Sequence, residues 1–402
     1  MRKNLYISTF ILLVAVLVLS ACGTAAQVNP QTIVQVQTQV VEKVVTATPG
    51  PAAATPLPAG SIQITAAGAT FPAPLYSQWT YAYQYVNPAV AINYNPIGSG
   101  AGKTAIVANT VDFAGSDSAL SDQNYTDGKD LQMYPMVAGA EVLAYNVAFK
   151  PVPTPAAGAA ALVLPKLILG RQLLVDIYNG KVSMWNDPEI IALNPGLKDY
   201  LPAAKITTVH RSDGSGTTDI FTHALAAFSA DWKAGAAQSV QWPGQGTLGG
   251  KGNAGVAAAI LSTPNSIGYV EIAYAISNSM TYAQMINKAG KTVSANGASI
   301  NADMADFGTA FDNNPKLTAY IPDGGSDGSW PITGYTYLIL HTTSMKDCTK
   351  AQAIVDFIKW AQTDPTAQKA ATTLGYSILP DAVRTAVLAK LAEVTCNGAP
   401  LK

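Results

Sequence analysis

Hydrophobic and polar positions along the chain follow two patterns, the strict alternation typical of β-strands and the periodicity typical of α-helices. Segments of the two kinds follow one another at short intervals. Residues 61–65 (Ser-Ile-Gln-Ile-Thr) alternate polar and apolar side chains and predict a β-strand, whereas residues 72–86 are aromatic-rich and start with a proline, which suits a helix. The same patterns predict strands at 90–94, 111–115, 206–210 and 335–341, and helices at 103–109, 218–228, 350–362 and 382–393. Strands that alternate with helices predict an α/β fold.

The loop after the second predicted strand is similar to a nucleotide-binding P-loop. It reads Ile97-Gly-Ser-Gly-Ala-Gly-Lys-Thr104, but the P-loop pattern needs a glycine at position 97, where this chain has isoleucine. The spacing alone leaves two interpretations open: a glycine turn after a strand, or a loop that holds phosphate.

The N-terminal part of the chain differs in character from the rest. A basic start precedes an apolar run over residues 6–19, which ends in Leu-Ser-Ala-Cys22. This order is typical of a secretory signal peptide, and its ending resembles a bacterial lipobox, which implies cleavage before Cys22 and a lipid on its sulfur. We expect a signal peptide at 1–21 and a lipid-anchored disordered linker at 22–60, rich in Pro, Ala and Thr. The mature protein would lie outside the cytoplasm, tethered to a membrane; the alternative is an uncleaved membrane anchor.

Composition narrows the classes of function. A chain of 402 residues is long enough for two lobes, and its net charge of −1 argues against nucleic acid as a partner. The chain has three His and three Cys, in no spacing that suits zinc, so we expect neither a metal site nor a cofactor. An exported protein permits a disulfide between Cys348 and Cys396; the alternative is two separate buried thiols.

Four turns share one layout, in which a strand ends and a polar or glycine-rich turn opens a helix. They lie at residues 68–72, 97–100, 115–117 and 211–217. Ligands of open α/β sheets bind beyond the carboxyl ends of the strands, and helix N-termini attract anions. Thr70, Ser99, Ser215 and Thr217 would add hydroxyl donors. Capping of the following helix explains Ser215 or Asp213 equally well, but four such turns favour an anion site.

Two charged residues indicate which anion fits. Arg211 can donate two charge-assisted hydrogen bonds to a tetrahedral oxyanion, with Asp213 orienting the guanidinium; the alternative is a surface ion pair. Asp117 would repel an anion unless that anion still carries a proton, because an ionised carboxylate only accepts hydrogen bonds. Phosphate keeps a proton at neutral pH and sulfate does not, so Asp117 would favour phosphate. The alternative is that Asp117 caps the next helix.

These turns, together with three later motifs, resemble the phosphate-binding protein of the bacterial phosphate ABC transporter. The later motifs are Gly-Gly-Lys-Gly-Asn at 249–253, Ser-Ile-Gly-Tyr-Val-Glu at 266–271 and Trp-Pro-Ile at 330–332. The matches run in order from about residue 64 to the C-terminus. The chain departs from the family at Ser212, where alanine is common, and in the Pro/Ala-rich segment 150–161.

The resemblance implies a two-lobed periplasmic-binding-protein fold (Venus-flytrap, type II) with a hinge of two chain crossings. We expect the crossings near residues 136–139 and 323–333. Lobe I would then comprise residues 61–137 and 333–402, and lobe II residues 138–332.

By the same resemblance, the ligand is inorganic phosphate and the chain is not an enzyme. The implied ligand groups are Thr70, Phe71 (backbone N–H), Ser99, Asp117, Arg211, Ser215, Gly216 and Thr217, with Asp213 orienting Arg211. Lys103 would only begin the helix behind the glycine loop. The implied partner is the membrane permease of a phosphate ABC transporter, and we expect a monomer. An enzyme with Ser215 as nucleophile is the rival hypothesis, but the chain lacks a Gly-x-Ser-x-Gly elbow there. A signalling or scavenging role in place of transport remains open.

Overall fold

The computed structural model describes residues 60–153, 160 and 162–401, which fall within one compact unit. The expected signal peptide, Cys22 and nearly all of the linker lie outside the described residues. None of the helices described in these ranges combines the length and the apolar character needed to cross a membrane.

One mixed sheet extends through the unit, and strand β4 (Leu131–Asn146) links its two halves. The strand order is β2-β1-β3-β11-β4-β8-β6-β7, with β12 also pairing with β4. Residues 131–140 of β4 pair with β11 (Thr333–His341), whereas residues 141–146 pair with β8 (Ser266–Glu271). The partner therefore changes within β4, between Ala140 and Glu141.

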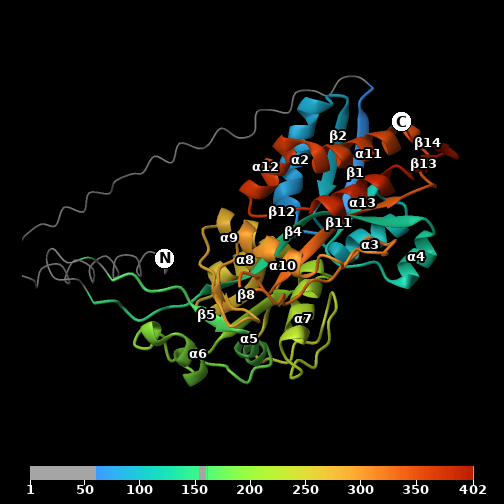
Figure 1. The fold of residues 1–402 in the computed structure, drawn as a ribbon. Helices are drawn as coiled ribbons and strands as arrows, with labels where there is room; N and C mark the ends of the chain where they lie inside the picture. The colour runs from blue at the N-terminus through green and yellow to red at the C-terminus, as the bar shows by residue number, and fades with distance from the viewer. Residues whose placement is uncertain (1–59, 154–159, 161, 402) are drawn as a thin grey trace, which may run out of the picture. The chain divides into compact units, whose positions relative to one another are not determined.

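The first half contains the N-terminal and C-terminal elements, which lie together in blue and red in Figure 1. Besides β11 and part of β4, it consists of β1 (Ile62–Gly68), α2 (Ala73–Val86), β2 (Val90–Asn95), α3 (Ser99–Val107), β3 (Phe113–Ser116), α4 (Asp122–Gly128), α11 (Cys348–Thr363), α12 (Pro365–Thr373), β12 (Ser377–Ile378), α13 (Asp381–Leu391), β13 (Thr395–Cys396) and β14 (Ala399–Pro400). Stacked aromatic rings fill its core, among them Phe113 and Phe357, whose centroids are 6.4 Å apart.

The second half is built from the middle of the chain, green to yellow in Figure 1. Besides β8 and the end of β4, it consists of β5 (Ile168–Gly170), α5 (Arg171–Tyr178), α6 (Pro188–Leu193), the 3-10 helix η1 (Pro195–Leu197), β6 (Thr207–Arg211), α7 (Gly216–Phe228), β7 (Leu248–Gly250), α8 (Gly252–Ser262), α9 (Ile272–Ser277), β9 (Gln284–Ile286) and β10 (Thr292–Val293). Its core centres on Phe221 and Tyr269, which stack with ring centroids 4.2 Å apart. Helix α10 (Gly297–Asp306) follows and contacts β4, β11 and β12.

Strand direction places the four predicted turns at two sheet edges. Strand β1 runs parallel to β2 and β3, so the turns that follow these three strands leave the sheet on the same side. Strand β6 runs parallel to β7 and β8, so the turns after β6 and β7 also share one edge. The turns after β1, β2, β6 and β7 each lead into a helix, so helix N-termini lie at both edges.

Two expectations from the hydrophobic pattern need correction. Helix α3 begins at Ser99, not at Lys103, so the lysine lies inside the helix and does not start it. The start was hidden because its first turn is made of glycine, alanine and serine, which give no apolar period. Strand β4 was not predicted, because all but its last residue is buried and a strand buried on both faces shows no alternation.

The structure joins Cys348, the first residue of α11, to Cys396 in β13 by a disulfide with an S–S distance of 2.01 Å. The link fastens the C-terminal hairpin β13–β14 to the helix that covers β1.

Candidate functional site

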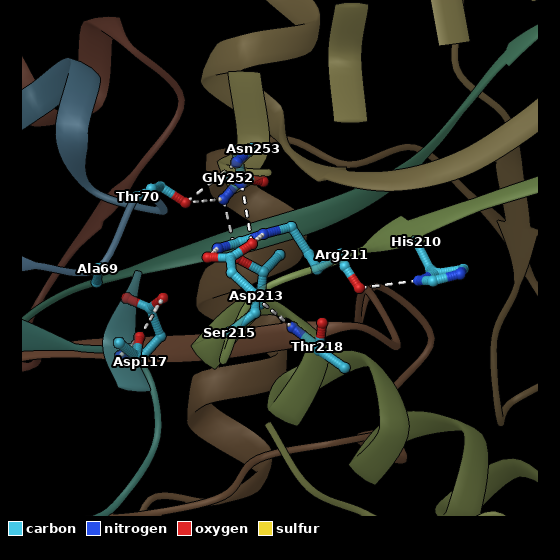
Figure 2. A network of polar contacts seen from close by, with 12 residues as sticks. Ala69, Thr70, Asp117, His210, Arg211, Asp213, Ser215, Thr218, Gly252 and Asn253 are labelled. Carbon is cyan, nitrogen blue, oxygen red and sulfur yellow. Dashed lines mark hydrogen bonds and ion pairs between the residues drawn. The ribbon is translucent and has the colours of Figure 1, made fainter. Parts of the chain in front are cut away.

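The predicted site residues converge from both halves of the molecule. Thr70 follows β1, Ser99 opens α3 and Asp117 follows β3 in the first half, whereas Arg211 ends β6 in the second. Figure 2 shows Arg211 and Asp213 side by side, with Thr70 and Asn253 on one side of them and Asp117 on the other.

The two halves touch closely around this point. The backbone N–H of Gly100 in α3 donates to the carbonyl of Gly214, at 3.0 Å. A Cβ placed on Gly216 would lie 2.5 Å from the Asp117 Cβ and 2.5 Å from the Ser99 Oγ. Only a residue without a side chain fits at position 216 in this arrangement.

Arg211 is a buried cation held rigidly in place, with 5% of its surface exposed. Its Nε donates to Asp213 Oδ1 at 2.8 Å and its Nη2 to Asp213 Oδ2 at 2.5 Å. Asp213 also accepts from the N–H of Gly252. Burial would raise the pKa of Asp213, but the hydrogen bonds and the charge of Arg211 hold it below its usual value. The alternative of a surface ion pair therefore does not hold for Arg211. Asp213 binds its guanidinium and the first N–H of α8, whereas the following helix α7 is capped by Ser215.

Asn253, at the start of α8, links Thr70 to Thr217 across the halves. Its Nδ2 donates to Thr70 Oγ1 at 3.0 Å and to Thr217 Oγ1 at 2.9 Å, and its backbone N–H also donates to Thr70 Oγ1. Thr217 Oγ1 accepts a second bond from Arg211. Because each threonine oxygen already accepts two hydrogen bonds, each hydroxyl hydrogen is left to donate elsewhere. Both hydroxyls are thus prepared as donors.

The N-terminus of α7 adds further donors. Gly216 and Thr217 are the first residues of this helix, so their N–H groups have no acceptor within it. Ser215 caps the helix by accepting a 3.0 Å bond from the N–H of Thr218, as the capping alternative proposed, and its own hydroxyl hydrogen is left to donate. Ser215 therefore serves the helix and also lies among the other site residues (Figure 2).

Thr70 and Phe71 form a turn whose carbonyls are fixed from the second half and from the C-terminal segment. The hydroxyl of Tyr274 in α9 donates to the Thr70 carbonyl at 2.6 Å. The hydroxyl of Tyr376 donates to the Phe71 carbonyl at 2.8 Å. Phe71 itself is fully buried. These bonds fix the orientation of the peptide that would present the Phe71 N–H.

Asp117 is a buried carboxylate among these donors, with 3% of its surface exposed. Thr336, in the middle of β11, donates to Oδ1 at 2.8 Å, and Ser99 donates to Oδ2 at 3.3 Å while accepting from the Asp117 N–H. Burial raises the pKa of Asp117 to about 7, and the Thr336 bond and the Arg211 charge limit the rise. Helix α4 is capped by Ser121, so the alternative of Asp117 as a helix cap does not hold.

Lys103 lies outside the site, because its ammonium donates to the Ser118 hydroxyl and the Ala119 carbonyl. Within residues 60–153, 160 and 162–401, no group of three or more His, Cys, Asp or Glu side chains is arranged to hold a metal ion. Two residues of the site were not predicted. Asn253 was noted only as part of the motif at 249–253, and Thr336 gave no signal in the sequence because it lies in a continuously buried strand.

Many donors and one buried acid converge between two halves of a shared sheet, and this arrangement defines a two-lobed α/β binding protein. A family model described as "PBP superfamily domain" matches residues 46–365. The chain is 42% identical to the phosphate-binding protein PstS of Xylella fastidiosa over 80% of this chain and 82% of the relative. It is 39% identical to PstS of Pasteurella multocida over 80% and 87% of the two chains. The chain therefore belongs to the PBP superfamily and, within it, to the family of the phosphate-binding proteins PstS.

Solved structures agree on the fold. A periplasmic phosphate-binding protein (PfluDING) bound with phosphate aligns with a TM-score of 0.62 and 23% identity, covering 82% of this chain and 93% of that one. A phosphate-binding protein from Stenotrophomonas maltophilia aligns with a TM-score of 0.58 and 20% identity, covering 82% and 94%. The α/β, two-lobed periplasmic-binding-protein fold expected from the sequence is thereby confirmed.

Proposed function

We propose that this protein captures inorganic phosphate between its two halves and delivers it to the membrane permease of a phosphate ABC transporter. The observation that carries the proposal is the pairing of Asp117 with Arg211 in one site. An anion bound there meets a guanidinium and several hydroxyl and N–H donors, but it also meets a carboxyl group. A ligand that still carries a proton satisfies both, and phosphate is such a ligand at neutral pH.

The donors are sufficient to offset the cost of burying an anion. An unpaired ion in a protein interior costs many kcal/mol. Each hydrogen bond to a charged group contributes roughly 1.5–3 kcal/mol. The proposed ligand groups are Thr70, Phe71, Ser99, Asp117, Arg211, Ser215, Gly216 and Thr217. Because they come from both halves, the ligand would bind both and favour the closed arrangement.

The decisive experiment is calorimetric titration of the purified protein with phosphate and with sulfate. We expect tight binding of phosphate and no heat from sulfate at about pH 8, where Asp117 is ionised. The Arg211→Ala variant should lose phosphate binding, because it leaves the anion without its buried cation. Arg384→Ala is the matched control: this arginine pairs with Asp381 on the surface of α13 and should bind phosphate as the wild type does. The proposed site would be contradicted if Arg384→Ala lost phosphate binding or if Arg211→Ala retained it.

The proposal places the protein outside the cytoplasm, anchored by a lipid on Cys22, and acting as a monomer. The support is the order of basic start, apolar run and Leu-Ser-Ala-Cys22 in the sequence. Mass spectrometry of the mature protein from a bacterial host should find an acylated Cys22 as the first residue. Cys22→Ala should release the protein from the membrane fraction, and light scattering should give the mass of a single chain.

The proposed lobe boundary at 137/138 lies three residues before the change of partner within β4, between Ala140 and Glu141. We propose lobe I at residues 61–137 and 333–402 and lobe II at 138–332, with hinges at the two crossings. The isolated bridge between Pro322 and Ile332, followed by β11, supports the second crossing. Small-angle scattering with and without phosphate should show a smaller radius of gyration in the complex.

Binding is proposed to occur without chemistry. Ser215 is the nucleophile of the rival enzyme hypothesis, but its oxygen caps α7. The nearest histidine in the sequence, His210, directs Nδ1 to the Arg211 carbonyl at 2.8 Å. Incubation with a chromogenic phosphate ester should give no turnover; turnover that disappears in Ser215→Ala would support the enzyme instead.

A further inference from the structure

Tyr320 connects the two halves of the molecule at the edge of the site. It lies in the segment between α10 and β11. Residue 319 falls within the range proposed for lobe II, but Ala319 packs on the first half, because its N–H and its carbonyl both bond to the Tyr337 hydroxyl of β11 at 3.0 Å. The Tyr320 hydroxyl reaches across to the second half and donates to Asp219 Oδ2 at 2.7 Å. Asp219 lies in the first turn of α7, two residues after Thr217.

The ring of Tyr320 makes a second contact with the same helix. His223 follows Asp219 by one turn of α7, and its ring stacks on Tyr320 with centroids 3.9 Å apart and planes 15° apart. His223 Nδ1 lies 2.8 Å from the Asp219 carbonyl, which fixes the imidazole on the helix. Tyr320 is thus held by a hydrogen bond at its hydroxyl and by a stacked ring along its face.

Asp219 is a buried acid: burial raises its pKa, and the hydrogen bond from Tyr320 limits the rise. Asp219 is 5% exposed, whereas Tyr320 is 40% exposed at the surface. Burial and the neighbouring Asp219 carboxyl raise the pKa of Tyr320 well above its usual value, so the hydroxyl keeps its proton and donates a hydrogen bond. A hydrogen bond to a buried carboxylate contributes more than one between neutral groups.

The contact lies directly beside the proposed phosphate site. A small pocket is lined by Asp117, Ile220, His223, Tyr320 and Tyr335, among others. One wall of this pocket is therefore the acid of the site, and another is the stacked pair. Separation of the halves at this edge requires Tyr320 to leave both Asp219 and His223.

We propose that Tyr320, Asp219 and His223 form a latch that positions α7 against the first half and sets how long a bound anion stays. The proposal rests on the proposed function, since it assigns these residues to release of phosphate. None of the three latch residues is among the proposed ligand groups, although the Asp219 N–H donates to the carbonyl of Ser215 at 3.1 Å. It stabilises the closed state, so its loss should accelerate dissociation and leave association nearly unchanged.

The test is a stopped-flow measurement of phosphate association and dissociation on the full chain. Tyr320→Phe keeps the ring and its stacking and removes only the hydroxyl, so it should fold normally. We expect its dissociation rate to rise roughly tenfold, since the lost bond is to a charged group. Asp219→Ala should show a similar rise. The double variant should dissociate no faster than about twice the faster single variant, because both changes remove the same contact.

Tyr81→Phe is the matched control. Its hydroxyl bonds to that of Tyr85 on the exposed face of α2, so the variant loses an equivalent group away from the site. It should release phosphate at the wild-type rate. Unchanged dissociation in Tyr320→Phe, or rate increases that multiply in the double variant, would overturn the latch. Failure of the wild type to bind phosphate would instead refute the proposed function.

Discussion

Replacing Asp117 with asparagine is the sharpest perturbation of the proposed site. The change keeps the size of the side chain and its bond from Thr336, but it removes the negative charge and adds a donor. Burial penalises the charged form of wild-type Asp117 and raises its pKa to about 7. Above that pH the carboxylate is ionised and needs a proton from the ligand; below it, the neutral acid can donate a proton itself.

The expected magnitude follows from the bond that is lost. A hydrogen bond between phosphate and an ionised carboxylate contributes roughly 1.5–3 kcal/mol, which corresponds to a rise in the phosphate Kd of roughly 10- to 150-fold at about pH 8. Sulfate should behave in the opposite way: the variant should bind it measurably, because the repelling charge is gone. As the pH falls through about 7, wild-type Asp117 becomes neutral, so the wild type should begin to bind sulfate and approach the variant.

The assay is calorimetric titration with each anion at about pH 8 and about pH 5.5, at constant ionic strength. Asp122→Asn is the matched control, because the Asp122 side chain is 95% exposed and pairs with Lys316 on the surface. If Asp117→Asn binds phosphate as tightly as the control and still rejects sulfate at the higher pH, the argument from the ligand proton is refuted.

Three further changes test other parts of the structure. Gly216→Ala places a Cβ 2.5 Å from the Asp117 Cβ, so calorimetry should find phosphate affinity reduced roughly 10- to 100-fold; unchanged affinity would show that the halves do not approach this closely. Exchanging Cys348 and Cys396 for serine opens a link between residues 48 apart, and the free energy of unfolding in urea should fall by about 4 kcal/mol with no change in phosphate Kd; a fall below about 1 kcal/mol would contradict this. For Asp130, burial would raise the pKa, but hydrogen bonds from neighbouring histidine, threonine and serine groups hold it well below its usual value. Its ionised form therefore stabilises the fold above the unfolded-state pKa of about 3.9, and this contribution is lost as the pH falls through the lower folded-state value. Asp130→Asn should lower the unfolding temperature at neutral pH and differ less from the wild type under strong acid; a gap that does not depend on pH would contradict this.

The sequence by itself determined the local elements and the chemical character of the site. Alternating and helical periods placed β1, β2, β6 and α7 to within a few residues. The turn chemistry of residues 211–217 favoured an anion-binding helix start, because its arginine, hydroxyls and glycines suit an oxyanion, although capping explained Ser215 equally well. Local propensity and local spacing decide these features, so they can be read from a single segment of chain.

Only the tertiary structure decided which segments meet. Strand β4 is buried along almost its whole length, so its pattern could not show that it joins both halves of the sheet. Thr336 contacts Asp117 across 219 residues of sequence, and Asn253 reaches Thr70 across 183. Such contacts depend on strand order and on how closely the halves approach, and hydrophobic burial over the whole unit sets both. The sequence supplied the donors and the acid, and the packing of the two halves decided that they face one another.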